Sequence, residues 1–214
     1  MSKDIIATGE VYHVYNQSIA DYRIFNSDSE FSRIVELIQY YQGEKQQVNF
    51  SKFKEYNMQH LKENIPDEEK LVEIICYCPM PTHFHLALKQ LKDQGISKFV
   101  NKVFNSYSHY FNIKHNRKGP LFTGRFKKVL VQTDEQLLHL TRYIHLNPVT
   151  AELVDYPADW KYSSYKEYID AADEKAICEY KDILDIKPGS YKVFVENRIA
   201  YQKELARIKN LMLD

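Results

Sequence analysis

The sequence has little cysteine, no long apolar run and no excess of charge of either sign. Its three cysteines, Cys76, Cys78 and Cys178, are too few and too odd in number for a disulfide framework. The first residues lack the apolar stretch of a signal peptide, and no segment approaches the ~20 apolar residues of a membrane span. These absences predict a reduced, cytoplasmic protein without a membrane partner.

Positive and negative charges balance, with 29 Lys+Arg and 29 Asp+Glu, and this argues against a uniformly basic surface. The charges are nevertheless segregated along the chain. Residues 114–128 contain six lysines and arginines and no acid, whereas residues 151–185 contain ten acids and four lysines. The basic run is either a solvated hairpin or a local phosphate-binding surface.

The chain of 214 residues is 44% apolar, which is enough for a sizeable core and predicts one domain with appendages. Hydrophobic periodicity, capping patterns and turn residues predict the elements. The predicted strands are 10–18, 71–78, 83–90 and one or two around Gly124, and the predicted helices are 28–42, 96–113, 134–147 and 190–211. This order predicts an α+β fold, with an antiparallel sheet and helices packed on one face.

Two further expectations concern segments rather than single elements. Residues 43–70 are polar, with a weak helical pattern from Phe53 to Leu61, and we interpret them as an insertion or exposed subelement. The helix 134–147 should end before Pro148, because a proline pushes the preceding residue out of the α region.

Two histidines one residue apart, His83 and His85, open a predicted strand. Residues two apart in a strand project from the same face, so these imidazoles point together while Phe84 points away. The pair is explained by ordinary hydrogen bonding, by half of a zinc site with Cys76 and Cys78, or by one side of a catalytic metal site. The Cys-x-Cys spacing is unlike a zinc knuckle, and a catalytic site needs a third ligand.

The helix before Pro148 carries a second polar set. Tyr143 and Asn147 are four residues apart and therefore share one face, and His139 continues that face one turn earlier. Tyr143 flanks the apolar stripe, so its phenol can reach a cleft at the sheet surface. In the simpler interpretation, Tyr143 is a boundary aromatic and Asn147 only ends the helix.

Three motifs that contain or lie between these residues resemble one known family. "MPTHFHLAL", "NRKGPLFTGRFKK" and "LTRYIHLNPVTAELV", in this order and spacing, resemble the REP-associated tyrosine transposases of the HUH single-tyrosine superfamily. "YHVYNQS" and "WKYSSYKEY" extend the similarity to about residues 10–170. The chain departs from the family in its long polar segment 43–70 and in Thr82, where an asparagine is common.

The resemblance implies a ferredoxin/RRM-like HUH nuclease core in residues 1–150, with a C-terminal helical extension in residues 151–214. It also implies cleavage and rejoining of single-stranded DNA through a 5′-phosphotyrosine. The nucleophile maps onto Tyr143. The metal-binding histidines map onto His83 and His85, which are also counted as catalytic, and the amide ligand maps onto Asn147. The ligand types favour Mg²⁺ or Mn²⁺.

The implied partner is single-stranded or hairpin DNA, bound by a monomer or homodimer associated with the nucleoid. The candidate DNA-binding residues are Arg117, Lys118, Arg125, Lys127 and Lys128. The candidate stacking surfaces are Tyr107, Tyr110 and Phe122. Tyr107 is a rival nucleophile without an amide four residues later. The alternative function is a hairpin- or sequence-specific DNA-binding protein that descends from such an enzyme and no longer cleaves.

Overall fold

A four-stranded antiparallel sheet forms the centre of the molecule. The computed structural model describes residues 6–46, 48–56, 66–172 and 176–211. The strands are β1 (Val11–Gln17), β2 (Val72–Met80), β3 (His83–Gln90) and β4 (Lys127–Val131), and their order in the sheet is β2-β3-β1-β4. All neighbouring strands are antiparallel, as the sequence predicted.

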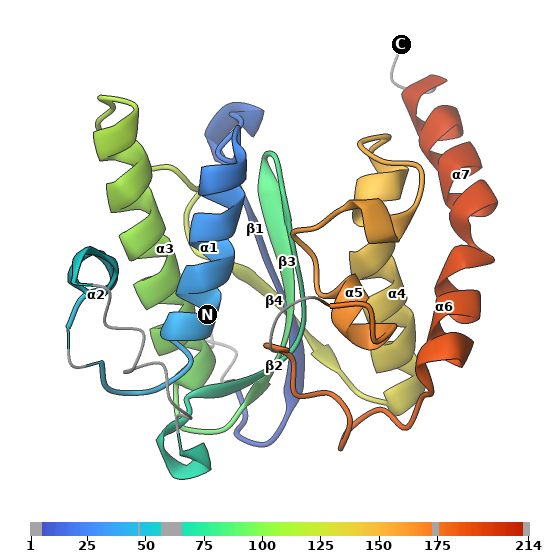
Figure 1. Cartoon of the computed structure of the whole chain (residues 1–214), viewed down its shortest axis with the longest axis horizontal. Coiled ribbons are helices and arrows are strands. Elements are labelled where there is room, and N and C mark those ends of the chain that lie inside the picture. Colours follow the sequence, from blue (N-terminus) through green and yellow to red (C-terminus); the bar gives the residue numbers. More distant parts are fainter. Residues whose placement is uncertain (1–5, 47, 57–65, 173–175, 212–214) are drawn as a thin grey trace, which may run out of the picture.

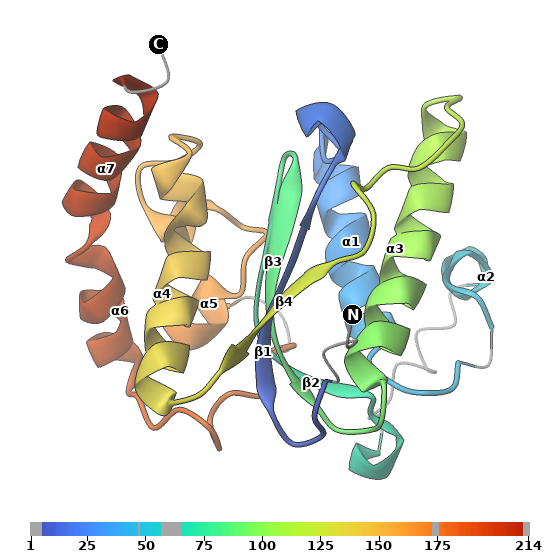
Figure 2. The ribbon, with the colours of Figure 1, turned by 180° about the vertical axis from the view of Figure 1, so that it is seen from behind.

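Helices cover both faces of this sheet, so the expectation that they pack on one face was wrong (Figures 1 and 2). The helices of one face are α1 (Asp28–Tyr40) and α3 (Gly95–Lys114). The helices of the other face are α4 (Asp134–Thr150), α5 (Tyr165–Tyr168), α6 (Pro188–Glu196) and α7 (Ile199–Leu211). The reason lies in β2, where eight of nine residues are buried, because such a strand needs cover on both sides.

Helix α4 begins where the sequence predicts and ends later. The Thr133 side chain accepts a hydrogen bond from the Gln136 backbone N–H (3.1 Å), and the Gln136 side chain accepts one from the Gln132 N–H (2.9 Å). Pro148 does not terminate the helix, which continues to Thr150. A proline this close to the C-terminal end removes one backbone hydrogen bond, and burial of the Pro148 ring favours the continued turn.

The polar segment 43–70 is less exposed than expected. It contains α2 (Phe50–Glu55), in which Phe50 and Phe53 are buried and lie against the Tyr40 ring. Two phenylalanines three residues apart share one helical face, and this anchors α2 to the core. The rest of the expected helical pattern, as far as Leu61, lies mostly outside the described residues.

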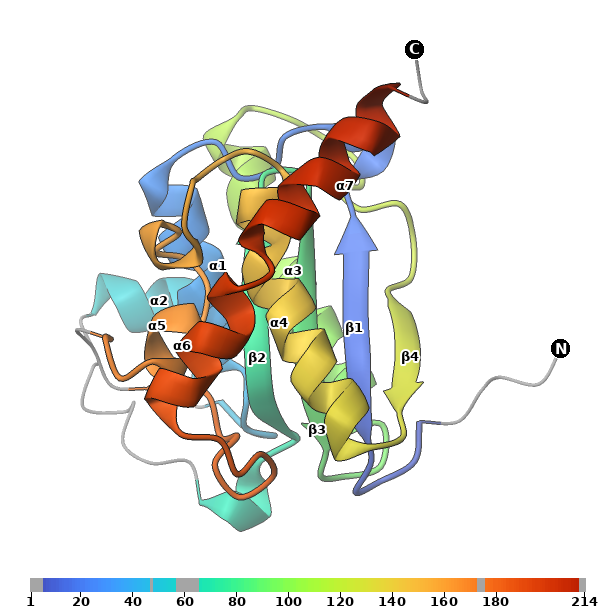
Figure 3. The ribbon, with the colours of Figure 1, turned by 90° about the vertical axis from the view of Figure 1, so that its right-hand side faces the viewer.

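Helices α6 and α7 lie outside α4 (Figure 3), while Ser164 and Glu179 of the same extension hydrogen-bond to the backbone of β2. The helix expected over 190–211 is two helices, α6 and α7, separated at residues 197–198. Between α4, β2 and α6, Tyr165, Tyr168 and Tyr191 are fully buried. These three rings surround the imidazole of His145, with centroid distances of 4.9–5.7 Å. The extension therefore fixes α4 against β2.

Candidate active site

The two histidines of the sequence motif lie on the sheet face that α4 covers. Strand β3 alternates, so Phe84 points to the opposite face and packs on Phe104 of α3, with ring centroids 4.3 Å apart. The rings of His83 and His85 are 5.1 Å apart and meet edge to face. His85 is 7% exposed, and His83 is more accessible. The expectation that both rings share one face is confirmed.

A third histidine, which the motif analysis missed, joins them from the neighbouring strand. In the β1–β3 register, Tyr15 lies opposite His85, and His13 projects from the same face one pleat away. The His13 Nε2 atom is 2.9 Å from His85 Nδ1, and the two rings stack at 5.2 Å. His13 and Tyr15 are two residues apart in "YHVYNQ", so their shared face was visible in the sequence. Their proximity to His85 was not.

Helix α4 brings its tyrosine to this histidine cluster. The Tyr143 ring meets His85 edge-on at 5.4 Å and His13 at 6.1 Å between centroids. Tyr143 remains 47% exposed, so a large substrate can reach its hydroxyl. Asn147 lies one turn later, and its Nδ2 donates to the Tyr143 carbonyl at 3.2 Å. The Asn147 side-chain oxygen is not part of that bond.

The protonation of the histidines suits a divalent metal. Burial lowers the pKa of His85 to about 3 and that of His13 to about 4, and it also lowers the pKa of His83. All three rings are therefore neutral at pH 7, as ligation requires. The Nδ1 atom of His83 is bonded to Thr82 Oγ1 at 3.0 Å, and that of His85 to His13.

The hydrogen bonds of both motif histidines thus use Nδ1 and leave Nε2 for a ligand. This is the usual arrangement around a metal, where the second ring nitrogen is held by a neighbouring group. The described residues contain no group of three His, Cys, Asp or Glu that is arranged to hold a metal ion. A two-histidine set completed by the Asn147 amide is a different donor set. It leaves positions open for substrate oxygens, as Mg²⁺ and Mn²⁺ sites require.

The basic residues between α3 and α4 are spread over both faces of the sheet edge. Lys127 lies on the histidine face, with its Nζ 5.9 Å from the Tyr15 ring centre. Arg125 and Lys128 line a cleft on the opposite face. Arg117 donates to the Pro120 carbonyl at 2.8 Å and so holds its own loop, and Lys118 is exposed.

The rival candidates are buried. Tyr107 is fully buried and its hydroxyl donates to the Ile24 carbonyl, so a large substrate has no access to it. The Cys76 thiol on β2 pairs with His145 of α4 (3.2 Å). Cys78 lies opposite His85 in the β2–β3 register, and its buried thiol is 3.9 Å from the Met80 sulfur. His139 is exposed, 2.7 Å from an Arg142 nitrogen, and no contact joins it to Tyr143 in the described structure.

Comparison with known families gives a match. The stretch 43–147, just under half of the chain, is similar to the family described as "Transposase IS200 like". The matched segment contains His83, His85, Tyr143 and Asn147, whereas β1 and its His13 precede it.

A solved structure shares the fold of this chain over most of its length. It is described as a REP-associated tyrosine transposase bound to a REP hairpin, and the similarity has a TM-score of 0.55 at 14% sequence identity. The similarity covers 84% of this chain and 96% of that chain, which confirms the α+β fold. Among curated proteins, no match was found. No helix in the described part of the chain is long and apolar enough to cross a membrane.

Proposed function

We propose that this protein is a transposase that cleaves and rejoins single-stranded DNA, with Tyr143 as the nucleophile. One observation carries the proposal: a half-exposed tyrosine on α4 contacts His85, and both motif histidines leave Nε2 without a hydrogen bond in the described structure. A nucleophile and a candidate metal-binding pair, separated by nearly sixty residues of sequence, are thereby neighbours. The similarity of residues 43–147 to a transposase family supports the same chemistry.

The proposed reaction is a reversible transfer of a phosphoryl group. The Tyr143 oxygen attacks the scissile phosphorus and loses its proton, and the bond to the 3′-oxygen breaks, so that this oxygen leaves as a hydroxyl after taking up a proton. The product is a 5′-phosphotyrosine. Because a phosphodiester is exchanged for another phosphodiester, a 3′-hydroxyl can reverse the step without a nucleotide cofactor.

His83 and His85 would hold the divalent cation through Nε2, with the Asn147 amide oxygen as the third protein ligand. When bound, Mg²⁺ or Mn²⁺ supplies Lewis-acid stabilisation of the developing charge on the phosphate. His13 acts through His85. If the His85 Nδ1–H donates to His13 Nε2, the tautomer with a free lone pair at His85 Nε2 is fixed. The stacked ring of His13 also limits rotation of His85.

The proposed substrate is hairpin or repeat DNA with an unpaired segment. Lys127 beside Tyr15 is the proposed phosphate contact nearest to the site. Arg117, Lys118, Arg125 and Lys128 are proposed as further backbone contacts. The related structure was obtained with a REP hairpin, and this supports a hairpin as the first substrate to test.

The test is incubation of the protein with a labelled hairpin and Mn²⁺ or Mg²⁺, followed by a denaturing gel. We expect a covalent protein–DNA adduct that disappears in Tyr143→Phe and after chelation of the metal. Tyr201→Phe, at an exposed tyrosine on α7, is the matched control and should form the adduct normally. An adduct that survives Tyr143→Phe contradicts the proposed nucleophile. Tight hairpin binding without any adduct in the wild type supports the binding-only alternative.

A further inference from the structure

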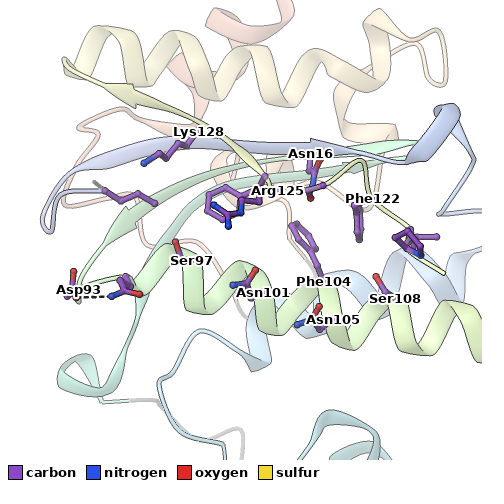
Figure 4. Close-up of a pocket in the computed structure, with 16 residues that line it drawn as sticks. Asn16, Asp93, Ser97, Asn101, Phe104, Asn105, Ser108, Phe122, Arg125 and Lys128 are labelled. Atoms are coloured by element: carbon purple, nitrogen blue, oxygen red, sulfur yellow. Dashed lines mark hydrogen bonds between the residues drawn. The ribbon is translucent and has the colours of Figure 1, made fainter. Parts of the chain in front are cut away.

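A second feature lies on the sheet face opposite Tyr143. It is an open cleft of about 1120 Å³, bounded by α3 on one side and by β1, β4 and residues 120–128 on the other (Figure 4). The sheet separates it from α4, so the cleft is not part of the histidine site (Figure 2). Its size exceeds that of most small-molecule pockets, and its open form suits an extended ligand.

The α3 wall of this cleft is a row of small polar side chains. Ser97, Asn101, Asn105 and Ser108 follow one another at intervals of four, four and three residues and share one helical face. Figure 4 shows Ser97 and Ser108 turned towards the strands, with Asn101 and Asn105 between them along α3. Within the described residues, no hydrogen bond occupies the Asn101 or Asn105 amide. Each amide offers a donor and an acceptor, which is the chemistry that recognises the edge of a base.

The opposite wall supplies charge, and the floor supplies aromatic surface. Arg125 and Lys128 line the wall, and Asp93 at the far end is the acid among the lining residues. Phe104 and Phe122 form the floor, with ring centroids 4.7 Å apart, and each is 9% exposed. Cations that follow a backbone, together with rings that accept bases, characterise sites for single-stranded nucleic acids.

The position of Arg125 is fixed by a buried side chain. Asn16 is 4% exposed, its amide donates to the Gly124 carbonyl at 3.1 Å, and its oxygen accepts from the Gln17 N–H at 2.9 Å. Gly124 has φ = +110°, a conformation that strongly favours glycine. The turn that presents Arg125 is therefore held by a dedicated hydrogen bond, whereas a loop that only connects two elements needs no such support.

We propose that this cleft binds a short unpaired stretch of the same DNA strand that Tyr143 attacks. The inference rests on the proposed function, and it assigns the unpaired bases to α3. Edge strand β4 joins the two sites, because Lys127 faces the histidines while its neighbour Lys128 lines the cleft. A strand that leaves the active site can thus pass around β4. From Ser97 to Ser108 the row of polar side chains is about 16 Å long. At about 3.4 Å per nucleotide, this length accommodates about five stacked nucleotides.

The experiment compares two fluorescent hairpins with the same stem, one blunt and one with an unpaired tail, by anisotropy. All proteins carry Tyr143→Phe, so that cleavage does not disturb binding. The cleft variants are Asn101→Ala with Asn105→Ala, and separately Arg125→Ala. The matched controls are Asn197→Ala after α6 and Lys181→Ala beside β2, the sheet edge opposite β4. Each changed side chain is exposed, so melting temperatures should stay unchanged.

We expect the parent protein to prefer the tailed hairpin by tenfold or more, as about one well-stacked base would give. The double asparagine variant should lose most of this preference while its affinity for the blunt hairpin is unchanged. Arg125→Ala should weaken tailed binding and reduce its salt dependence by about one phosphate contact. If both cleft variants keep the tail preference of the controls, the inference is overturned.

The adduct assay separates this inference from the proposed function. The double variant Asn101→Ala with Asn105→Ala, carrying the native Tyr143, should still form the adduct at saturating DNA. An adduct without any effect of the cleft variants on tail preference refutes the cleft and leaves the cleavage proposal intact. Loss of tail preference in a protein that never forms an adduct supports the cleft and refutes the cleavage proposal.

Discussion

Helix α4 carries two tyrosine–histidine clusters that differ in almost every respect except composition. Over β3 and β1, Tyr143 lies against His85 and His13 and is 47% exposed. Between β2 and α6, His145 is fully buried, and its Nδ1 is 2.6 Å from the Tyr191 hydroxyl. In the first cluster, the Nε2 atom of His85 has no hydrogen bond within the described residues. In the second cluster, both imidazole nitrogens of His145 have partners within the protein.

The buried cluster connects four elements through one side chain. The Nε2 atom of His145 is 2.8 Å from Ser164 Oγ, next to α5, and 3.2 Å from the Cys76 sulfur on β2, while its Nδ1 pairs with Tyr191 on α6. Positions two apart on a helix are about 200° apart around its axis. His145 therefore anchors the side of α4 that is roughly opposite Tyr143, and this anchoring fixes the orientation in which Tyr143 faces the histidines.

The largest effect on stability should come from removing a buried ring of the His145 cluster. Tyr191→Ala removes a fully buried ring and leaves a cavity beside His145, so we expect a loss of about 3–5 kcal/mol in the free energy of unfolding. Tyr143→Ala is the matched change on the open side, and its effect should stay within about 0.5 kcal/mol. Urea denaturation measures both. Equal losses in the two variants would contradict the division into an open and a buried cluster.

How far the sequence predicts this site depends on how local each contact is. The shared face of His83 and His85 follows from strand alternation, and that of Tyr143 and Asn147 from helical spacing. Neither needs the tertiary structure. His13 depends on β1 lying next to β3, a pairing between residues 72 apart that no local pattern records. The family resemblance supplied the link between strand and helix that periodicity alone left open.

The difference between local patterns and long-range contacts also explains the errors in the predicted fold. Helix and strand positions follow from local patterns and were predicted within a few residues. The continuation of α4 through Pro148, the burial of Phe50 and the cover on both sheet faces all result from packing between distant segments. Burial energy overrides local preference at these places. The role of His145 was missed for this reason, because its partners come from β2, α5 and α6.

An intermediate effect should follow from removing His13, which supports His85 without being a proposed ligand. His13→Ala frees the His85 ring and its tautomer, so we expect the metal concentration for half-maximal adduct formation to rise about 10–100-fold. Adduct yield at saturating Mn²⁺ should recover in large part, which a merely misfolded variant would not show. His139→Ala, at an exposed histidine on α4, is the control. An unchanged metal requirement would remove His13 from the site.

The smallest effect concerns alkaline stability and distinguishes the buried cluster from the open one. Burial raises the pKa values of Tyr191 and Tyr168 well above the ordinary 10.0 and that of Cys76 above 9.0. The unfolded chain releases these protons at the ordinary values while the folded protein retains them. The unfolded state then binds fewer protons, so stability is complete below pH 9 and falls as the pH rises through 10.

Tyr191→Phe isolates one of these protons. It removes the hydroxyl that meets His145, so the free energy of unfolding should fall by about 1–3 kcal/mol at neutral pH. Above pH 10, the stability of the variant should decline less steeply than that of the wild type, by about 1.4 kcal/mol per pH unit. Urea midpoints across this pH range measure both effects. Parallel pH curves would mean that the Tyr191 hydroxyl ionises within the folded protein, and the cluster around His145 would then be open to water as the one around Tyr143 is.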